Sequence, residues 1–248
     1  MSSIVNQKNR APSRRQINFF ENNKFKQELF NKALLLYKKE DKISWTKNIV
    51  NTNLPLLAID SKGIENIVKA IPKDLKFEFL DNVKFDYHES TIVYAKILNT
   101  LKSCQEIAKY LLPFAEFIDN WASCDTLAFN LKGKEKEELF DLALNYVKSD
   151  KAFCRRVGFR ILFKFIEDKY IDKIFDAIKD AFFEKEYYVN MIVAWLLCEM
   201  FIKSREKTLA FARANKLNDF VKNKFISKCN DSFRVSKEDK TMLKTLKN

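Results

Sequence analysis

The chain has 248 residues, enough for one large core or two small ones, and a net charge of +12 from 45 basic and 33 acidic side chains. Only three glycines and four prolines punctuate it, which disfavours a sandwich or barrel of many short strands. The basic excess lies in residues 1–48 and 203–248. An anionic partner is therefore a candidate, with solvated lysine on polar helix faces as the alternative explanation.

The cysteines and glycines disfavour several kinds of site. The cysteines are Cys104, Cys124, Cys154, Cys198 and Cys229. Their odd number and wide spacing, without a Cys-x-x-Cys pair, predict reduced thiols in the core rather than a disulfide framework or a zinc site. Three scattered glycines form neither of the common phosphate-binding loops. We therefore expect neither a metal nor a cofactor.

Nothing in the sequence indicates a membrane segment. Residues 1–15 lack an apolar run of signal-peptide length, and the most apolar stretch, residues 187–202, is interrupted by Asn190 and Glu199. We therefore expect a cytoplasmic protein.

Taken in chain order, the predicted elements are helices. Residues 1–20 are polar and basic, and predict an arm or a loosely packed first helix. From residue 25 onward, apolar side chains recur at helical spacing, with the clearest stripes in residues 25–37, 139–147 and 171–182. Candidate breaks, Pro113 among them, leave helices of about 10 to 18 residues.

The arrangement of these helices predicts the fold class. Helix pairs recur about every 35 to 40 residues in the middle of the chain, within the range of HEAT-like repeats. Ser236 followed by Asp239 predicts a capping box at the start of a last helix. We predict an all-α helical-repeat solenoid that forms one domain over residues 21–248.

Hydrolysis by a catalytic triad is disfavoured because His88 is the only histidine and no nucleophile-elbow sequence accompanies it. His88 is better explained as a helix-start or surface residue. The segment that stands apart contains Trp121 and Asp125, which are four residues apart and so share a helix face. The segment therefore combines an aromatic ring and a carboxylate on one predicted helix face.

Two further features accompany that pair. Arg155 and Arg156 precede an apolar helix, and Trp195 lies within an apolar run. Each has an ordinary structural explanation: Asp125 as a helix cap, both tryptophans as core, and both arginines as solvated side chains.

Four segments, in order, resemble the AlkD-like DNA alkylation repair proteins. Residues 118–125 (IDNWASCD) resemble the family's Asn-Trp-x-x-Cys-Asp signature. Residues 155–158 resemble the arginine-containing start of a later helix, residues 187–195 the tryptophan-bearing helix, and residues 231–240 the C-terminal signature. The resemblance covers roughly residues 85–248.

The resemblance implies a C-shaped array of HEAT-like repeats whose basic concave face binds duplex DNA. It also implies cleavage of the N-glycosidic bond of cationic purines alkylated at N3 or N7. By position, Asp125 would be the catalytic carboxylate, Trp121 and Trp195 the aromatic contacts beside the lesion, and Arg156, preferred to Arg155, a phosphate contact. We expect a monomer with little sequence preference, associated with the nucleoid when bound to DNA.

Other basic residues within the matched segments are assigned to the DNA backbone: Arg155, Arg234 and Lys237. The N-terminal third departs from the family pattern, because residues 51–59 lack the glycine before a Pro step and the basic pair after it. The alternative function is therefore a helical-repeat scaffold that binds DNA or protein without turnover.

Overall fold

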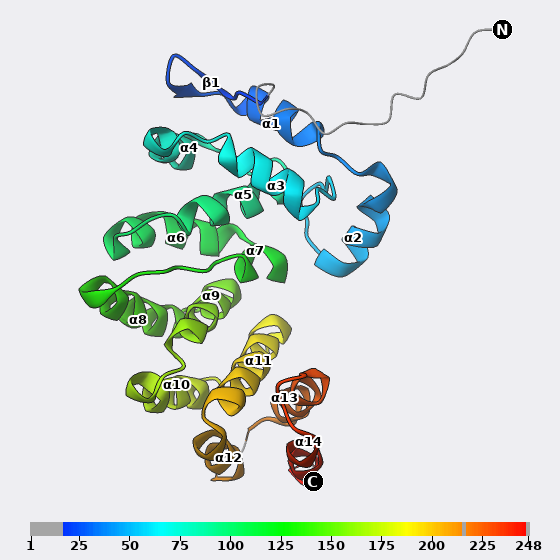
Figure 1. Cartoon of the computed structure of the whole chain (residues 1–248), viewed down its shortest axis with the longest axis vertical. Coiled ribbons are helices and arrows are strands. Elements are labelled where there is room, and N and C mark those ends of the chain that lie inside the picture. Colours follow the sequence, from blue (N-terminus) through cyan, green and yellow to red (C-terminus); the bar gives the residue numbers. More distant parts are fainter. Residues whose placement is uncertain (1–16, 215–216, 247–248) are drawn as a thin grey trace, which may run out of the picture. The chain divides into compact units, whose positions relative to one another are not determined.

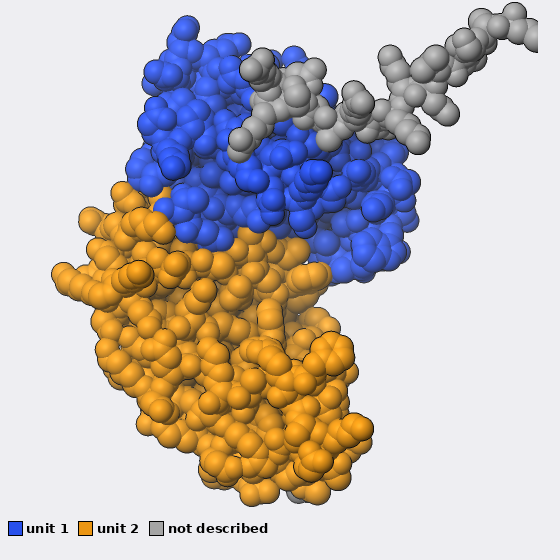
Figure 2. Space-filling view, in the orientation of Figure 1, with its two compact units in different colours: residues 1–100 blue, residues 101–248 orange. Residues whose placement is uncertain are grey.

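The computed structural model describes residues 17–214 and 217–246. Across these residues the protein is all-α, with 14 α-helices and one two-stranded hairpin (Figure 1). The predicted fold class is confirmed. The chain divides into two compact units, Met1–Thr100 and Leu101–Asn248 (Figure 2). A single domain over residues 21–248 stays a prediction.

Unit 1 begins with the hairpin, which the sequence analysis missed. Strands β1 (Phe20–Glu21) and β2 (Lys24–Phe25) pair antiparallel. Asn22 and Asn23 between them have positive φ, a conformation that asparagine tolerates better than most residues. Phe19 is fully buried, so residues 17–20 are packed chain. The rest of the predicted basic arm, residues 1–16, lies outside the described residues.

The helices of unit 1 pack around apolar side chains such as Phe30, Ile67 and Phe79, all fully buried. They are α1 (Gln27–Leu35), α2 (Ile43–Val50), α3 (Ser61–Lys69), α4 (Lys76–Asn82) and α5 (His88–Leu98). His88 starts α5, as predicted, and its side chain is buried.

The N-terminal segment that departs from the family pattern, residues 51–59, is anchored by a buried acid. The carboxylate of Glu89 accepts hydrogen bonds from the backbone N–H groups of Leu57 (3.1 Å) and Ile59 (3.3 Å). Burial raises the pKa of Glu89. Ala58, between the two donors, has positive φ. Glu89 therefore stabilises a strained turn in unit 1.

Unit 2 contains the other nine described α-helices. They are α6 (Cys104–Phe117), α7 (Trp121–Asp125), α8 (Gly133–Val147), α9 (Ala152–Leu162), α10 (Asp168–Asp180), α11 (Tyr187–Lys203), α12 (Arg205–Ala214), α13 (Asp219–Asp231) and α14 (Lys237–Lys244). None of the described helices is long and apolar enough to cross a membrane. All five cysteines are buried, as predicted for core thiols.

Alternate helices of unit 2 form a row. α7 packs on α9, α9 on α11, and α11 on α13 (Figure 1). These helices begin at residues 121, 152, 187 and 219. Successive starts are 31, 35 and 32 residues apart, at or just below the predicted repeat of about 35 to 40 residues.

One predicted break is wrong. Pro113 lies inside α6 rather than at its end. A proline in a helix removes one backbone hydrogen bond and crowds the preceding turn. Here Pro113 is on the exposed face, while Leu111, Phe114 and Ala115 are fully buried. Packing of the opposite face therefore keeps the helix intact.

Gly158 lets α8 and α9 approach closely. A Cβ atom at this position would lie 2.7 Å from both the carbonyl oxygen of Ala143 and the backbone nitrogen of Val147. Only glycine fits without a shift of backbone. Because Gly158 lies between Arg156 and Arg160, this contact also sets the position of both arginines.

Candidate active site

The short helix α7 is anchored by its first residues. The side chain of Asn120 caps it, accepting hydrogen bonds from the backbone N–H (3.0 Å) and hydroxyl (3.1 Å) of Ser123. Asn120, Ser123 and Cys124 are fully buried, whereas Trp121 and Asp125 are half-buried. The predicted pair therefore lies on the more accessible side of α7, with Asp125 as its last residue rather than its cap.

Asp125 and Arg156 form a bidentate ion pair. One guanidinium nitrogen of Arg156, Nη2, donates to both carboxylate oxygens of Asp125, at 2.8 and 3.0 Å. The other, Nη1, donates to the backbone carbonyl of Tyr188 at 2.5 Å. The side chain of Arg156 is 4% exposed and that of Asp125 is 19% exposed. The pair thus fixes a carboxylate at the surface of the helix row.

A second arginine reaches the same residue through its backbone. Arg160 donates to the main-chain carbonyl of Asp125 from Nε (3.2 Å) and Nη2 (3.1 Å). A carboxylate at the C-terminus of a helix is repelled by the carbonyl groups there that have no hydrogen-bond partner within the helix. The positive charges of Arg156 and Arg160 offset this repulsion. Burial lowers the pKa of Arg160.

The neighbouring thiol adds no negative charge beside these cations. Burial raises the pKa of Cys124 to about 12, so the thiol stays protonated at neutral pH. Asp125 is then the negatively charged partner of Arg156.

Arg155 points into a separate network. Its guanidinium forms a bidentate pair with Glu184 (2.6 and 3.1 Å) and donates to the carbonyls of Ser149 and Asp150. Glu184 also accepts from the backbone N–H groups of Lys185 and Glu186. This clamp joins the start of α9 to the segment that precedes α11, whose Tyr188 carbonyl holds Arg156.

Trp195 on α11 is connected to Asp125 through α9. Its ring packs edge-on against Phe163 with ring centroids 4.7 Å apart, and the Arg160 guanidinium lies 5.5 Å from the Phe163 ring. The indole N–H donates to Glu199 at 3.3 Å, and the Lys228 ammonium lies 5.8 Å from the indole. Trp195 lines a cavity of about 240 Å³.

The predicted C-terminal contacts differ in their surroundings. Arg234 is paired with both oxygens of Glu199, at 2.5 and 2.9 Å, and lines the cavity beside Trp195. Lys237, the first residue of α14, is exposed and has no carboxylate partner within the described residues. The helix start predicted at Ser236 is confirmed, because its hydroxyl accepts from the N–H of Asp239 at 3.0 Å and so caps α14.

Sequence reasoning missed Arg160 and Glu199. Arg160 follows Arg156 by four residues, so helical periodicity alone places both on one face of α9. Glu199 likewise follows Trp195 by four residues, on the same face of α11. The spacing was a usable signal in both cases.

A family model described as DNA alkylation repair enzyme matches residues 30–223. The chain belongs to this family. The match confirms the family resemblance and includes Trp121, Asp125, Arg156 and Trp195, whereas Arg234 and Lys237 lie beyond it. A search of curated proteins finds no match. Membership places the chain among the enzymes of DNA alkylation repair, with DNA as their substrate.

Proposed function

We propose that this family member is a DNA N-glycosylase that releases cationic alkylated purines, of the 3-methyladenine or 7-methylguanine type, from duplex DNA. The observation that supports it is the carboxylate of Asp125, fixed by Arg156 and partly exposed beside Trp121 on the same helix.

The leaving group determines what the protein must supply. A purine with a formal positive charge departs as a neutral base, so no strong general acid is needed. Positive charge then develops on the deoxyribose, and a carboxylate placed there stabilises the transition state more than the ground state. Asp125 is the proposed catalytic residue.

Arg156 would act as a positioning residue for that carboxylate. Each carboxylate oxygen has two lone pairs, and the guanidinium uses one on each. The remaining lone pairs would be available to face the sugar or to orient water, since the side chain of Asp125 is 19% exposed. The bidentate geometry holds this orientation before DNA binds.

The indoles would provide selectivity for charge. A cation near a tryptophan face is stabilised by roughly 0.5 to 2 kcal/mol, depending on desolvation. Trp121 and Trp195 would therefore favour a cationic lesion over a neutral base without reading a base edge. Basic side chains would contribute phosphate contacts that carry no sequence information.

The test is release of base from duplex DNA that contains 7-methylguanine or 3-methyladenine, compared with spontaneous loss from the same DNA. We expect release by the wild-type chain and a loss of about 100- to 1000-fold in Asp125→Asn, the scale seen when one electrostatic group is removed from an active site. Tight DNA binding without release of either base would instead support the non-catalytic scaffold.

A matched control is available in unit 2. The carboxylate of Asp239 is paired with Arg205 and is also 19% exposed. Asp239→Asn removes an aspartate–arginine ion pair outside the proposed site, so it should retain base release. Equal losses in the two variants would remove Asp125 from the mechanism.

A further inference from the structure

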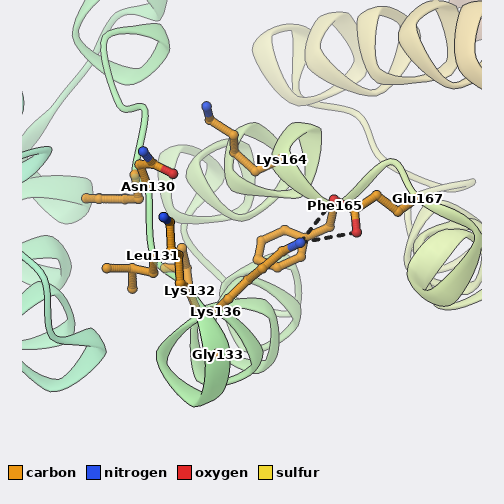
Figure 3. A pocket seen from close by; sticks show the side chains of 10 residues that line it. Asn130, Leu131, Lys132, Gly133, Lys136, Lys164, Phe165 and Glu167 are labelled. Carbon is orange, nitrogen blue, oxygen red and sulfur yellow. Dashed lines mark hydrogen bonds and ion pairs between the residues drawn. The ribbon is translucent and has the colours of Figure 1, made fainter.

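A cavity of about 380 Å³ in unit 2 lies between the start of α8, the loop before it, and the 3-10 turn Phe163–Phe165 after α9 (Figure 3). Phe129, Leu131, Leu139 and Phe165 are buried and form its apolar floor. Its polar lining is Asn130, Lys132, Lys136, Lys164 and Glu167.

The charges around this cavity leave two cations available. Lys136 is paired with Glu167, at 3.0 and 3.1 Å, and turns toward it in Figure 3. Lys132 and Lys164 are exposed, and neither has a carboxylate partner in the part of the chain that the structure describes. Glu167 is the one acidic residue in the described lining.

The acidic side chains at the start of α8 are engaged elsewhere. Glu135 accepts from the backbone N–H of Cys104, Glu137 from Lys169 and Tyr170, and Glu138 pairs with Lys134. They therefore do not neutralise Lys132 or Lys164 across the cavity.

The backbone at the cavity is also suited to an anion. Lys132 occupies the N-cap position of the 15-residue helix α8, and no side chain caps the first N–H groups. Gly133 has a φ of +55°, and no heavy atom lies within 4 Å of the position of a Cβ. The lysines, the Asn130 amide and these N–H groups are all donors, as phosphate oxygens require.

The cavity is linked by short segments to the residues of the proposed active site. Lys164 follows Arg156 by eight residues, about 12 Å along a helix axis. Phe163, next to Lys164, packs on Trp195. The loop that carries Lys132 follows α7 and Asp125 directly.

We propose that Lys132 and Lys164 each bind a backbone phosphate of the DNA strand whose deoxyribose faces Asp125. This inference rests on the proposed function, because the DNA strand is identified by the deoxyribose that would face Asp125. The chemistry recognised is a phosphate ester, and we assign it to duplex DNA rather than to a free nucleotide because of the links to Asp125 and Trp195.

The test measures the affinity for undamaged duplex DNA as a function of salt. Each phosphate contact in B-DNA contributes about −0.9 to the slope of log K against log salt concentration. Lys132→Gln and Lys164→Gln should each reduce the steepness by about 0.9. Lys134→Gln is the control of equal charge, because Lys134 lies on the same turn of α8, is 88% exposed and does not line the cavity. Its slope should stay that of the wild type.

This test is independent of the proposed function, because binding to undamaged DNA is measured without any release of base. Slopes unchanged in both variants would overturn the proposal, as would an equal change in Lys134→Gln, which would mean a general charge effect. Titration of the wild-type chain and both variants with deoxyadenosine monophosphate distinguishes the phosphate source. Nucleotide binding that depends on the two lysines, with unchanged DNA slopes, would overturn the assignment to DNA.

Discussion

At the scale of single residues, the structure points to a second role for Arg156. The sequence resemblance implies a phosphate contact, but the guanidinium is almost fully buried and donates to Asp125 and to the Tyr188 carbonyl. A side chain engaged in this way orients another residue more readily than it reaches a phosphate. The two roles predict different kinetics.

Arg156→Lys tests them directly, because lysine keeps the charge but cannot make the same forked contacts. If Arg156 positions Asp125, base release at saturating enzyme should fall at least about tenfold, while the affinity for undamaged DNA and its salt dependence stay close to wild type. If it contacts phosphate, the affinity for undamaged DNA should fall instead, because lysine keeps the charge, and with it the salt slope, but not the forked contact with the phosphate. Single-turnover rates and salt titrations on the same samples measure both quantities.

At the scale of elements, Gly158 connects helix packing to the site. Gly158→Ala places a Cβ 2.7 Å from two backbone atoms of α8, so α9 must shift. Overpacking of this kind costs about 1 to 3 kcal/mol, more than alanine gains over glycine in a helix. We expect a melting temperature lower by several degrees and slower base release, because Arg156 and Arg160 move with α9. Unchanged thermal melting would contradict the close contact.

The clamp between Arg155 and Glu184 gives this part of unit 2 a dependence on pH. Burial alone would raise the pKa of Glu184, but hydrogen bonds from Arg155 and from two backbone N–H groups outweigh it and lower the pKa. The unfolded chain therefore binds this proton more readily. The contribution to stability is complete above the ordinary value of about 4.5 and is lost as the pH falls through the folded-state pKa.

Glu184→Gln should therefore be less stable than wild type at neutral pH and should lose less further stability on acidification from about pH 6 to pH 3. Chemical unfolding at each pH measures the free energy of unfolding. Glu186→Gln, at an exposed neighbouring position, is the control and should follow the wild-type curve. A parallel loss in Glu184→Gln and wild type would exclude the clamp as a source of acid sensitivity.

The helices also show which features could be predicted from the sequence and which could not. Helical stripes such as residues 139–147 and 171–182 became α8 and α10, because one buried face is enough to specify a helix. Pro113 wrongly predicted a helix end. The cost of a proline inside α6 is outweighed by burial of the opposite face of that helix, which only the tertiary structure determines. Trp121 and Asp125 could be paired by spacing, but the Asp125–Arg156 contact joins residues 31 positions apart. No local pattern contains that information.

At the scale of the whole molecule, a net charge of +12 favours association with a polyanion, but the distribution of paired and unpaired cations decides which side chains contribute. Many basic groups are held by carboxylates, among them Arg155 by Glu184 and Arg234 by Glu199. A paired arginine adds less to the field at a phosphate than an unpaired lysine does.

Arg234 and Lys237 allow this argument to be tested within one short segment. Arg234 is compensated by Glu199, whereas Lys237 is exposed and has no carboxylate partner in the described chain. Both were assigned to the DNA backbone from the sequence. We expect Lys237→Gln to reduce the steepness of the salt dependence of DNA binding by about 0.9. Arg234→Gln should reduce it by less, because the charge of Arg234 is already compensated by Glu199 and is not available to a phosphate. The affinities should be similar for unrelated duplex sequences, since phosphate contacts carry no base information.

A larger effect from Arg234→Gln would mean that DNA displaces Glu199 from the pair, and the cavity beside Trp195 would then open when DNA binds.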